Sequence, residues 1–122
     1  MEYGKHVLCE KPLASNAREA MEMVVASRKY KVCLMEAMKP TLTPNFIQLM
    51  KSVELVGKIR YYFSAFCQYS SRYDKFKAGI HVNAFDPSLA NGATMDIGIY
   101  TIYPMIVLFG KPKAIHARGV LL

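Results

Sequence analysis

Two short apolar runs on either side of an amphipathic stretch constrain the fold of this chain more than any other feature. The runs are Val7 to Cys9, inside a predicted strand over residues 6–10, and residues 32–35. The stretch between them repeats apolar residues at helical spacing, namely Ala17, Ala20, Met21, Val24 and Val25. Ser15 is a suitable N-cap for a helix that runs to about Lys29. A strand, a helix and a strand in so short a span form a βαβ unit with parallel pairing. We therefore predict an α/β fold that begins with a piece of a parallel sheet.

The first predicted strand ends in the charged tripeptide Glu10-Lys11-Pro12. Proline has a fixed φ and pushes the preceding residue into an extended conformation, so the backbone aims Lys11 more strictly than a surface lysine requires. Ligands bind α/β sheets at the carboxyl ends of parallel strands, where Lys11 would lie. Lys11 is therefore a candidate functional residue. The alternative is that Lys11 pairs with Glu10 or with solvent.

The chain changes character at Pro40 and Pro44, which mark a boundary or crossover. Thr43 followed by Pro44 suits the start of a helix. Residues 59–69 then alternate apolar and polar side chains, which predicts a long strand with one apolar face in an antiparallel or mixed sheet. We expect a long loop with short structured pieces over 70–92 and a final strand over 114–122.

A helix is predicted between these segments, over residues 93–109, and it carries a second unusual pair. Asp96 and Tyr100 are four residues apart and share one helix face. Pro104 cannot donate a hydrogen bond to the carbonyl of Tyr100, so we expect a bend there, which is common where a helix lines a site. The alternative is that Asp96 caps or solvates the helix and Tyr100 is a core aromatic.

The two segments together resemble the signatures of one family. GKHVLCEKPLA (residues 4–14) and NGATMDIGIYTIYPMIVLFG (residues 91–110), in this order, closely resemble the Gfo/Idh/MocA family of NAD(P)-dependent oxidoreductases. The resemblance implies that residues 1–40 are the last βαβ piece of a Rossmann-like dinucleotide-binding domain. It implies that residues 41–122 are the first half of an open, mostly antiparallel α+β domain for substrate binding and oligomerisation. The chain would then be an internal fragment, truncated at both ends.

The resemblance also implies roles for single residues. Glu10, Lys11 and Pro12 would contribute to the cofactor site, Lys11 would contact the reacting hydroxyl, and Asp96 would bind substrate. Many members have a histidine acid/base four residues after that aspartate. This chain has Tyr100 there, like the branch that resembles glucose–fructose oxidoreductase and dimeric dihydrodiol dehydrogenase. A tyrosine hydroxyl is protonated at neutral pH, and a nearby ammonium group favours the phenolate, so Lys11 and Tyr100 form a coherent catalytic pair.

The implied reaction is hydride transfer between NAD or NADP and a sugar, cyclitol or related alcohol. None of the 7 glycines falls into the G-x-G-x-x-G spacing that cradles a pyrophosphate, so we expect the isolated chain to be inactive. A non-catalytic binding or assembly module that keeps the same fold fragment is the alternative from another functional class.

Composition narrows the partners. The formal charge of +7 raises the question of nucleic acid, but the basic residues are scattered in small groups, as on a solvated surface. We therefore expect no nucleic-acid partner and keep a basic nucleic-acid binder as a third alternative. With 52% hydrophobic residues and incomplete domains, strand edges and an apolar face along residues 59–65 would stay uncovered. We therefore expect a homodimer or a larger homo-oligomer.

The remaining features favour a cytoplasmic protein without a metal. Cys9, Cys33 and Cys67 include no C-x-x-C pair, and the 3 histidines lack metal-ligand spacing. The N-terminus has no signal-peptide layout. No apolar run reaches the roughly 18 residues that suggest a membrane span, since tyrosines and a proline interrupt the nearest candidate, Ile97 to Phe109. We therefore expect no membrane association.

Overall fold

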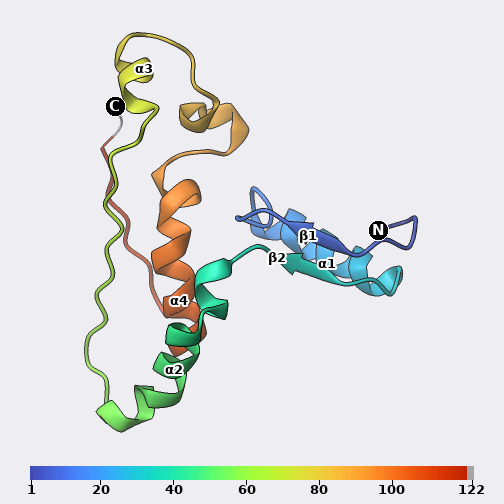
Figure 1. The fold of residues 1–122 in the computed structure, drawn as a ribbon, viewed down its shortest axis with the longest axis vertical. Coiled ribbons are helices and arrows are strands. Elements are labelled where there is room, and N and C mark those ends of the chain that lie inside the picture. Colours follow the sequence, from blue (N-terminus) through green and yellow to red (C-terminus); the bar gives the residue numbers. More distant parts are fainter. Residues whose placement is uncertain (121–122) are drawn as a thin grey trace.

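The structure, a computed structural model, describes residues 1–120 and begins with the predicted strand–helix–strand unit. Strand β1 (Val7–Cys9), helix α1 (Ala17–Lys29) and strand β2 (Leu34–Glu36) follow one another (Figure 1). The strands pair in parallel with Val7 opposite Leu34 and Cys9 opposite Glu36. The prediction of a βαβ unit is thereby confirmed.

Helix α1 is capped one residue later than predicted. Asn16, not Ser15, is the N-cap, and its Oδ1 accepts a hydrogen bond from the backbone N–H of Glu19 at 3.0 Å. The Ser15 hydroxyl donates instead to the Glu19 carboxylate. Asn16 is the N-cap because its extended backbone directs its side chain toward the free N–H groups of the first turn.

Only part of the predicted apolar face of α1 is half-buried. Ala20 and Val24 are half-buried, whereas Met21 and Val25 remain 60% and 56% exposed. The face of the small sheet away from α1 is also open, since Leu8 is 69% exposed. Parallel strands are normally covered on both faces, so this unit presents apolar surface that the described residues do not cover.

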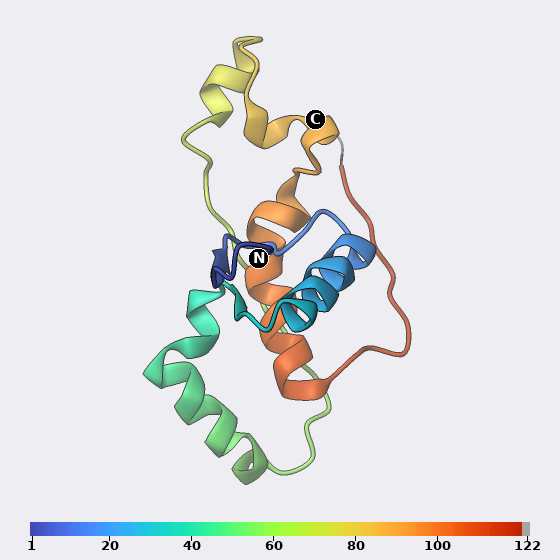
Figure 2. The same ribbon diagram turned by 90° about the vertical axis from the view of Figure 1, so that its right-hand side faces the viewer.

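The next segment is helical, as the Thr43-Pro44 pair predicted. A 3-10 turn (Lys39–Leu42) precedes helix α2 (Pro44–Ser52), and Pro44 occupies its first turn. A second 3-10 turn (Val53–Val56) ends at Gly57, whose φ of 75° lies in the left-handed region that glycine tolerates. In Figure 2, α2 lies to the left of the C-terminal helix, and α1 lies in front of that helix.

The strand predicted over residues 59–69 is not formed. The segment runs as a long extended stretch between α2 and the next helix (Figure 1), but it has no strand partner among residues 1–120. The prediction of a final strand fails in the same way for residues 114–120, while Leu121 and Leu122 lie outside the described residues. Alternation of side chains makes a strand possible, but a ladder also needs a neighbouring backbone. The expected antiparallel sheet is therefore absent from the part of the chain that is described.

Short helical pieces occupy the loop, as predicted, and lead into the C-terminal helix. They are α3 (Tyr73–Lys77), a 3-10 turn at Asn83–Phe85 and another at Pro87–Leu89. A π-helical turn (Thr94–Gly98) then runs directly into α4 (Ile99–Phe109), which contains Pro104 and ends at Gly110. Departure from regular helix geometry thus occurs at Thr94–Gly98, one turn before the predicted bend at Tyr100. A π-helical turn inside a helix frequently marks a functional site.

This C-terminal stretch is more apolar than the sequence-based expectation allowed. By length and composition alone, Pro87–Phe109 could cross a membrane, and 6% of its apolar 18-residue window is buried. The core helix of a soluble protein passes the same test. The backbone is also interrupted within the stretch, because Ala90 and Gly92 have positive φ values of 53° and 121°. The uninterrupted helical part, Thr94–Phe109, is shorter than the about 20 residues that a bilayer requires.

The most deeply buried side chain of the described residues is that of Met38. Met38, 2% exposed, is the buried apolar residue of the described chain, and it lies between β2 and the 3-10 turn at Lys39–Leu42. The junction between the βαβ unit and the rest of the chain is therefore its best-packed region.

Candidate active site

The loop after β1 carries Lys11 to the start of the C-terminal helix. The Lys11 Nζ donates to Oδ1 of Asp96 at 3.0 Å and also to the backbone carbonyl of Asp96. These two residues are 85 positions apart in the sequence. The Lys11 side chain is 15% exposed and that of Asp96 is 54% exposed, so the ion pair lies at the surface with its cation mostly covered. The contact joins the βαβ unit to the π-helical turn.

Tyr100 completes this cluster. The Lys11 Nζ lies 4.9 Å from the centroid of the Tyr100 ring, within the range of a cation–π contact. Asp96 and Tyr100 therefore both contact Lys11, as their shared helix face allows. The structure brings together the three residues that the two sequence motifs singled out. The ammonium contacts the tyrosine ring as well as the carboxylate, so its position is fixed from two directions.

Phe66 is a neighbour of this cluster that neither sequence motif contains. Its ring stacks on that of Tyr100, with centroids 5.4 Å apart and planes at 24°. Tyr62, four residues earlier, packs against Phe109 at 5.4 Å, and its hydroxyl reaches the carbonyl of Thr101. The even-numbered aromatic residues of segment 59–69 thus face α4. The predicted apolar face is the opposite one, where Tyr61 is 79% exposed and Phe63 is 74% exposed. The sequence signal for this packing is the pair of aromatic residues, Tyr62 and Phe66, on the face that otherwise carries polar residues.

The remaining predicted site residues lie on either side of Lys11. The side chain of Glu10 is exposed and Pro12 is half-buried. Neither makes a contact that tests a cofactor-binding role, which stays a prediction. Two surface hollows lie elsewhere: one of about 380 Å³ beside residues 79–87 and one of about 530 Å³ on the outer side of α1. The Lys11–Asp96–Tyr100 cluster lies apart from both hollows.

The N-terminus of α1 does not fit the pyrophosphate of a dinucleotide. A pyrophosphate site needs free N–H groups at a glycine-rich turn. Here Asn16 occupies the N–H of Glu19, and the Glu19 carboxylate places a negative charge in the first turn. The hydrogen bond from the Ser15 hydroxyl lowers the pKa of the Glu19 carboxyl group, and Asn16 lowers it by a smaller amount. The lowered pKa keeps this carboxylate ionised. Within residues 1–120, the N-terminus of α1 is therefore not suited to a pyrophosphate.

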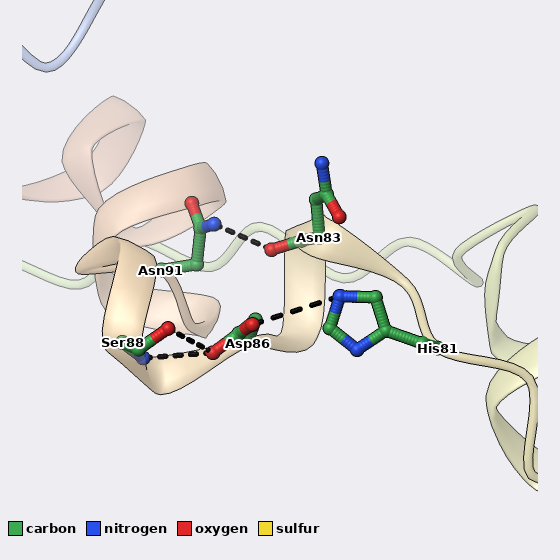
Figure 3. Close-up of polar contacts among 5 residues, drawn as sticks. All are labelled: His81, Asn83, Asp86, Ser88 and Asn91. Carbon is green, nitrogen blue, oxygen red and sulfur yellow. Dashed lines mark hydrogen bonds and ion pairs between the residues drawn. The ribbon is translucent and has the colours of Figure 1, made fainter.

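A second polar network orders the loop before the π-helical turn (Figure 3). The Ser88 hydroxyl donates to Oδ1 of Asp86 at 2.6 Å, and the Ser88 N–H donates to the same oxygen at 2.9 Å. The other carboxylate oxygen lies 3.6 Å from Nε2 of His81. Asn91 closes the loop by donating from Nδ2 to the carbonyl of Asn83 at 2.6 Å. This network compacts residues 81–91 immediately before the segment that carries Asp96.

We expect this loop to lose its order in acid. The two hydrogen bonds from Ser88, first from its hydroxyl and then from its N–H, lower the pKa of Asp86, and the charge of His81 adds to the effect. A lowered pKa in the folded state means that the stabilisation is present above the ordinary aspartate pKa. It is lost as the pH falls through the lowered value. NMR chemical shifts of the Ser88 amide should titrate with a midpoint below 3.8.

Two variants check this expectation. Ser88→Ala removes the hydroxyl bond and should move the midpoint upward, while Asp86→Asn should abolish the transition. A wild-type midpoint at or above the ordinary aspartate value would contradict the proposed order of the loop.

Comparison with known proteins gives one consistent result. Residues 1–38 match a family described as "Oxidoreductase family, NAD-binding Rossmann fold". The chain is 55% identical to scyllo-inositol 2-dehydrogenase (NADP(+)) IolU of Bacillus subtilis, over 98% of the chain and 36% of that protein. It is 44% identical to the uncharacterized oxidoreductase YgjR of Escherichia coli, over 96% of the chain and 36% of that protein. It is 32% identical to trans-1,2-dihydrobenzene-1,2-diol dehydrogenase of Xenopus laevis, over 99% of the chain and 36% of that protein. The chain thus spans about a third of the length of these relatives.

Proposed function

We propose that this chain, a relative of the Gfo/Idh/MocA oxidoreductases, handles the substrate hydroxyl in a protein that transfers a hydride between NAD or NADP and a polyol. The observation that carries the proposal is the meeting of Lys11, Asp96 and Tyr100 on one surface. The relatives are named dehydrogenases and oxidoreductases, which supports this class of reaction. In this proposal residues 1–40 end a dinucleotide-binding domain and residues 41–122 begin a substrate domain.

The chemistry divides naturally among the three side chains. Oxidation of an alcohol removes a hydride from carbon and a proton from the hydroxyl, and a nicotinamide cofactor, when bound, would supply the hydride acceptor. The Tyr100 oxygen takes the proton in this direction and returns it in the other. Lys11 donates a hydrogen bond to the reacting oxygen, and its ammonium group lies 4.9 Å from the centroid of the Tyr100 ring. Asp96 holds Lys11 in place and accepts a hydrogen bond from a second substrate hydroxyl.

The substrate that best suits this arrangement is a ring with hydroxyls on neighbouring carbons. Scyllo-inositol and trans-1,2-dihydrobenzene-1,2-diol, the compounds in the names of two relatives, both have this feature. An ammonium group and a carboxylate 3.0 Å apart can address two adjacent hydroxyls at once. We therefore propose a cyclic vicinal diol or polyol as the substrate class. The free thiols of Cys9, Cys33 and Cys67 are consistent with a cytoplasmic location, which we propose as well.

A chimera tests this function. In it, the present chain replaces the matching third of the Bacillus subtilis relative, so that Lys11, Asp96 and Tyr100 come from this chain. We expect reduced nicotinamide to form when cyclic vicinal diols are supplied with NAD or NADP, and little to form with a cyclic alcohol that bears one hydroxyl. Binding of a polyol without turnover would instead favour the non-catalytic module. Equal rates with both alcohols would contradict the proposed substrate class.

A further inference from the structure

The loop that carries Lys11 is held from the second strand by Glu36. The backbone N–H of Leu13 donates to Oε1 of Glu36 at 2.9 Å, and both residues are half-buried. Glu36 is the last residue of β2 and lies opposite Cys9, the last residue of β1. Its side chain therefore reaches forward from the sheet edge into the loop that leaves the neighbouring strand.

Further contacts make this anchor rigid. The N–H of Ala37 donates to the carbonyl of Cys9 at 2.8 Å, and the Cys9 thiol donates to the carbonyl of Leu13 at 3.6 Å. The N–H of Met38 donates to the carbonyl of Glu36 at 2.8 Å, and Met38 is 2% exposed. Glu36 thus stands beside the best-buried point of the described chain. A carboxylate on a firm backbone can fix a loop, whereas one on a mobile backbone could not.

These contacts enclose Lys11 between two fixed points. Cys9, two residues before it, is held by Ala37, and Leu13, two residues after it, is held by Glu36. We propose that Glu36 is a positioning residue, which holds the Lys11 loop so that the ammonium reaches Asp96 and Tyr100. The inference deepens the proposed function and rests on it for the catalytic importance of Lys11. Glu36 itself acts through Leu13 and does not contact the substrate.

The geometry distinguishes the two obvious substitutions. Glutamine keeps a carbonyl oxygen at the position of Oε1 and can still accept from the Leu13 N–H. Alanine leaves that half-buried N–H without its partner. Glu36→Gln should therefore preserve the loop and Glu36→Ala should release it. Glu22→Ala removes the same charge from the exposed side of α1 and is the matched control.

Chemical labelling of the 122-residue chain measures the position of Lys11 without any assay of activity. Competitive acylation, read by mass spectrometry of peptides, reports how free the Lys11 amine is. Loss of one hydrogen bond to a charged acceptor corresponds to roughly a tenfold change in an equilibrium. We therefore expect Glu36→Ala to raise the labelling rate of Lys11 about tenfold. In Glu36→Gln and Glu22→Ala the labelling rate of Lys11 should stay near that of the wild type. Asp96→Asn gives the labelling rate of Lys11 without its carboxylate partner.

Hydrogen exchange separates positioning from a general loss of structure. In Glu36→Ala the Leu13 amide should exchange faster, while the Val7 and Ala37 amides, which bond across β1 and β2, should keep their protection. Unchanged labelling of Lys11 in Glu36→Ala, or equal loss of protection at all three amides, would overturn the inference.

The chimera adds a functional readout. There, Glu36→Ala should lower kcat with little change in the KM for cofactor, and Glu36→Gln should restore it. Failure of the chimera to turn over any alcohol would refute the proposed function but leave the labelling result standing.

Discussion

Replacing Lys11 by methionine or Tyr100 by phenylalanine in the active chimera is expected to lower kcat by about 10²–10⁴-fold, the usual contribution of general acid–base catalysis. Methionine keeps much of the length of lysine but removes the charge that contacts Asp96 at 3.0 Å and the Tyr100 ring at 4.9 Å. Phenylalanine keeps the ring that stacks on Phe66 and removes only the hydroxyl. Both variants should therefore fold normally and fail in the chemical step.

Single-turnover kinetics with a deuterated alcohol would assign the defect to that step. The matched control is Tyr103→Phe, the same substitution one turn further along α4, which should retain normal turnover. Near-normal turnover of Tyr100→Phe would mean that Tyr100 packs against Phe66 and has no part in proton transfer.

The isolated chain is expected to self-associate and to bind neither NAD nor NADP tightly. Large apolar side chains are uncovered on several elements, as shown by the exposures of Leu8 (69%), Tyr61 (79%) and Phe63 (74%). The two-stranded sheet also leaves both outer strand edges open within the described residues. Open edges and apolar faces favour pairing with another copy. The α1 N-terminus is occupied by Asn16 and Glu19, so it offers little to a pyrophosphate.

Light scattering at several salt concentrations would measure the association. With a formal charge of +7, copies repel one another at low ionic strength, so salt should strengthen assembly. We expect a homodimer or larger species, and titration with each dinucleotide should show no micromolar complex. A monomer that persists at high salt, or tight binding of either dinucleotide, would contradict this expectation.

Local patterns in the sequence were sufficient for the βαβ unit and for the start of α2. The helical spacing between residues 17 and 29 and the Thr43-Pro44 pair act within a few residues, where backbone sterics and capping decide the outcome. The sequence did not distinguish Ser15 from Asn16 as the N-cap of α1, since both residue types can cap a helix. Asn16 is the N-cap because its backbone is extended where the helix begins.

Long-range pairing was beyond the reach of local patterns. Alternation over residues 59–69 indicated one apolar face, yet the structure forms no ladder there and packs Tyr62 and Phe66 on α4 instead. A strand acquires its ladder from another backbone, and side-chain order alone does not provide that backbone. The predicted strand over residues 114–120 failed for the same reason.

The candidate site shows the same division. Local sequence patterns were enough to place Lys11 just after a strand and to put Asp96 and Tyr100 on one helix face, because both predictions depend on local periodicity. The packing of distant elements is what brings the Lys11 ammonium to that face, 85 residues away in the sequence, and places Glu36 and Phe66 beside the contact. Such neighbours are set by how separate elements pack, and packing joins residues whose separation along the chain carries no signal of their closeness in space.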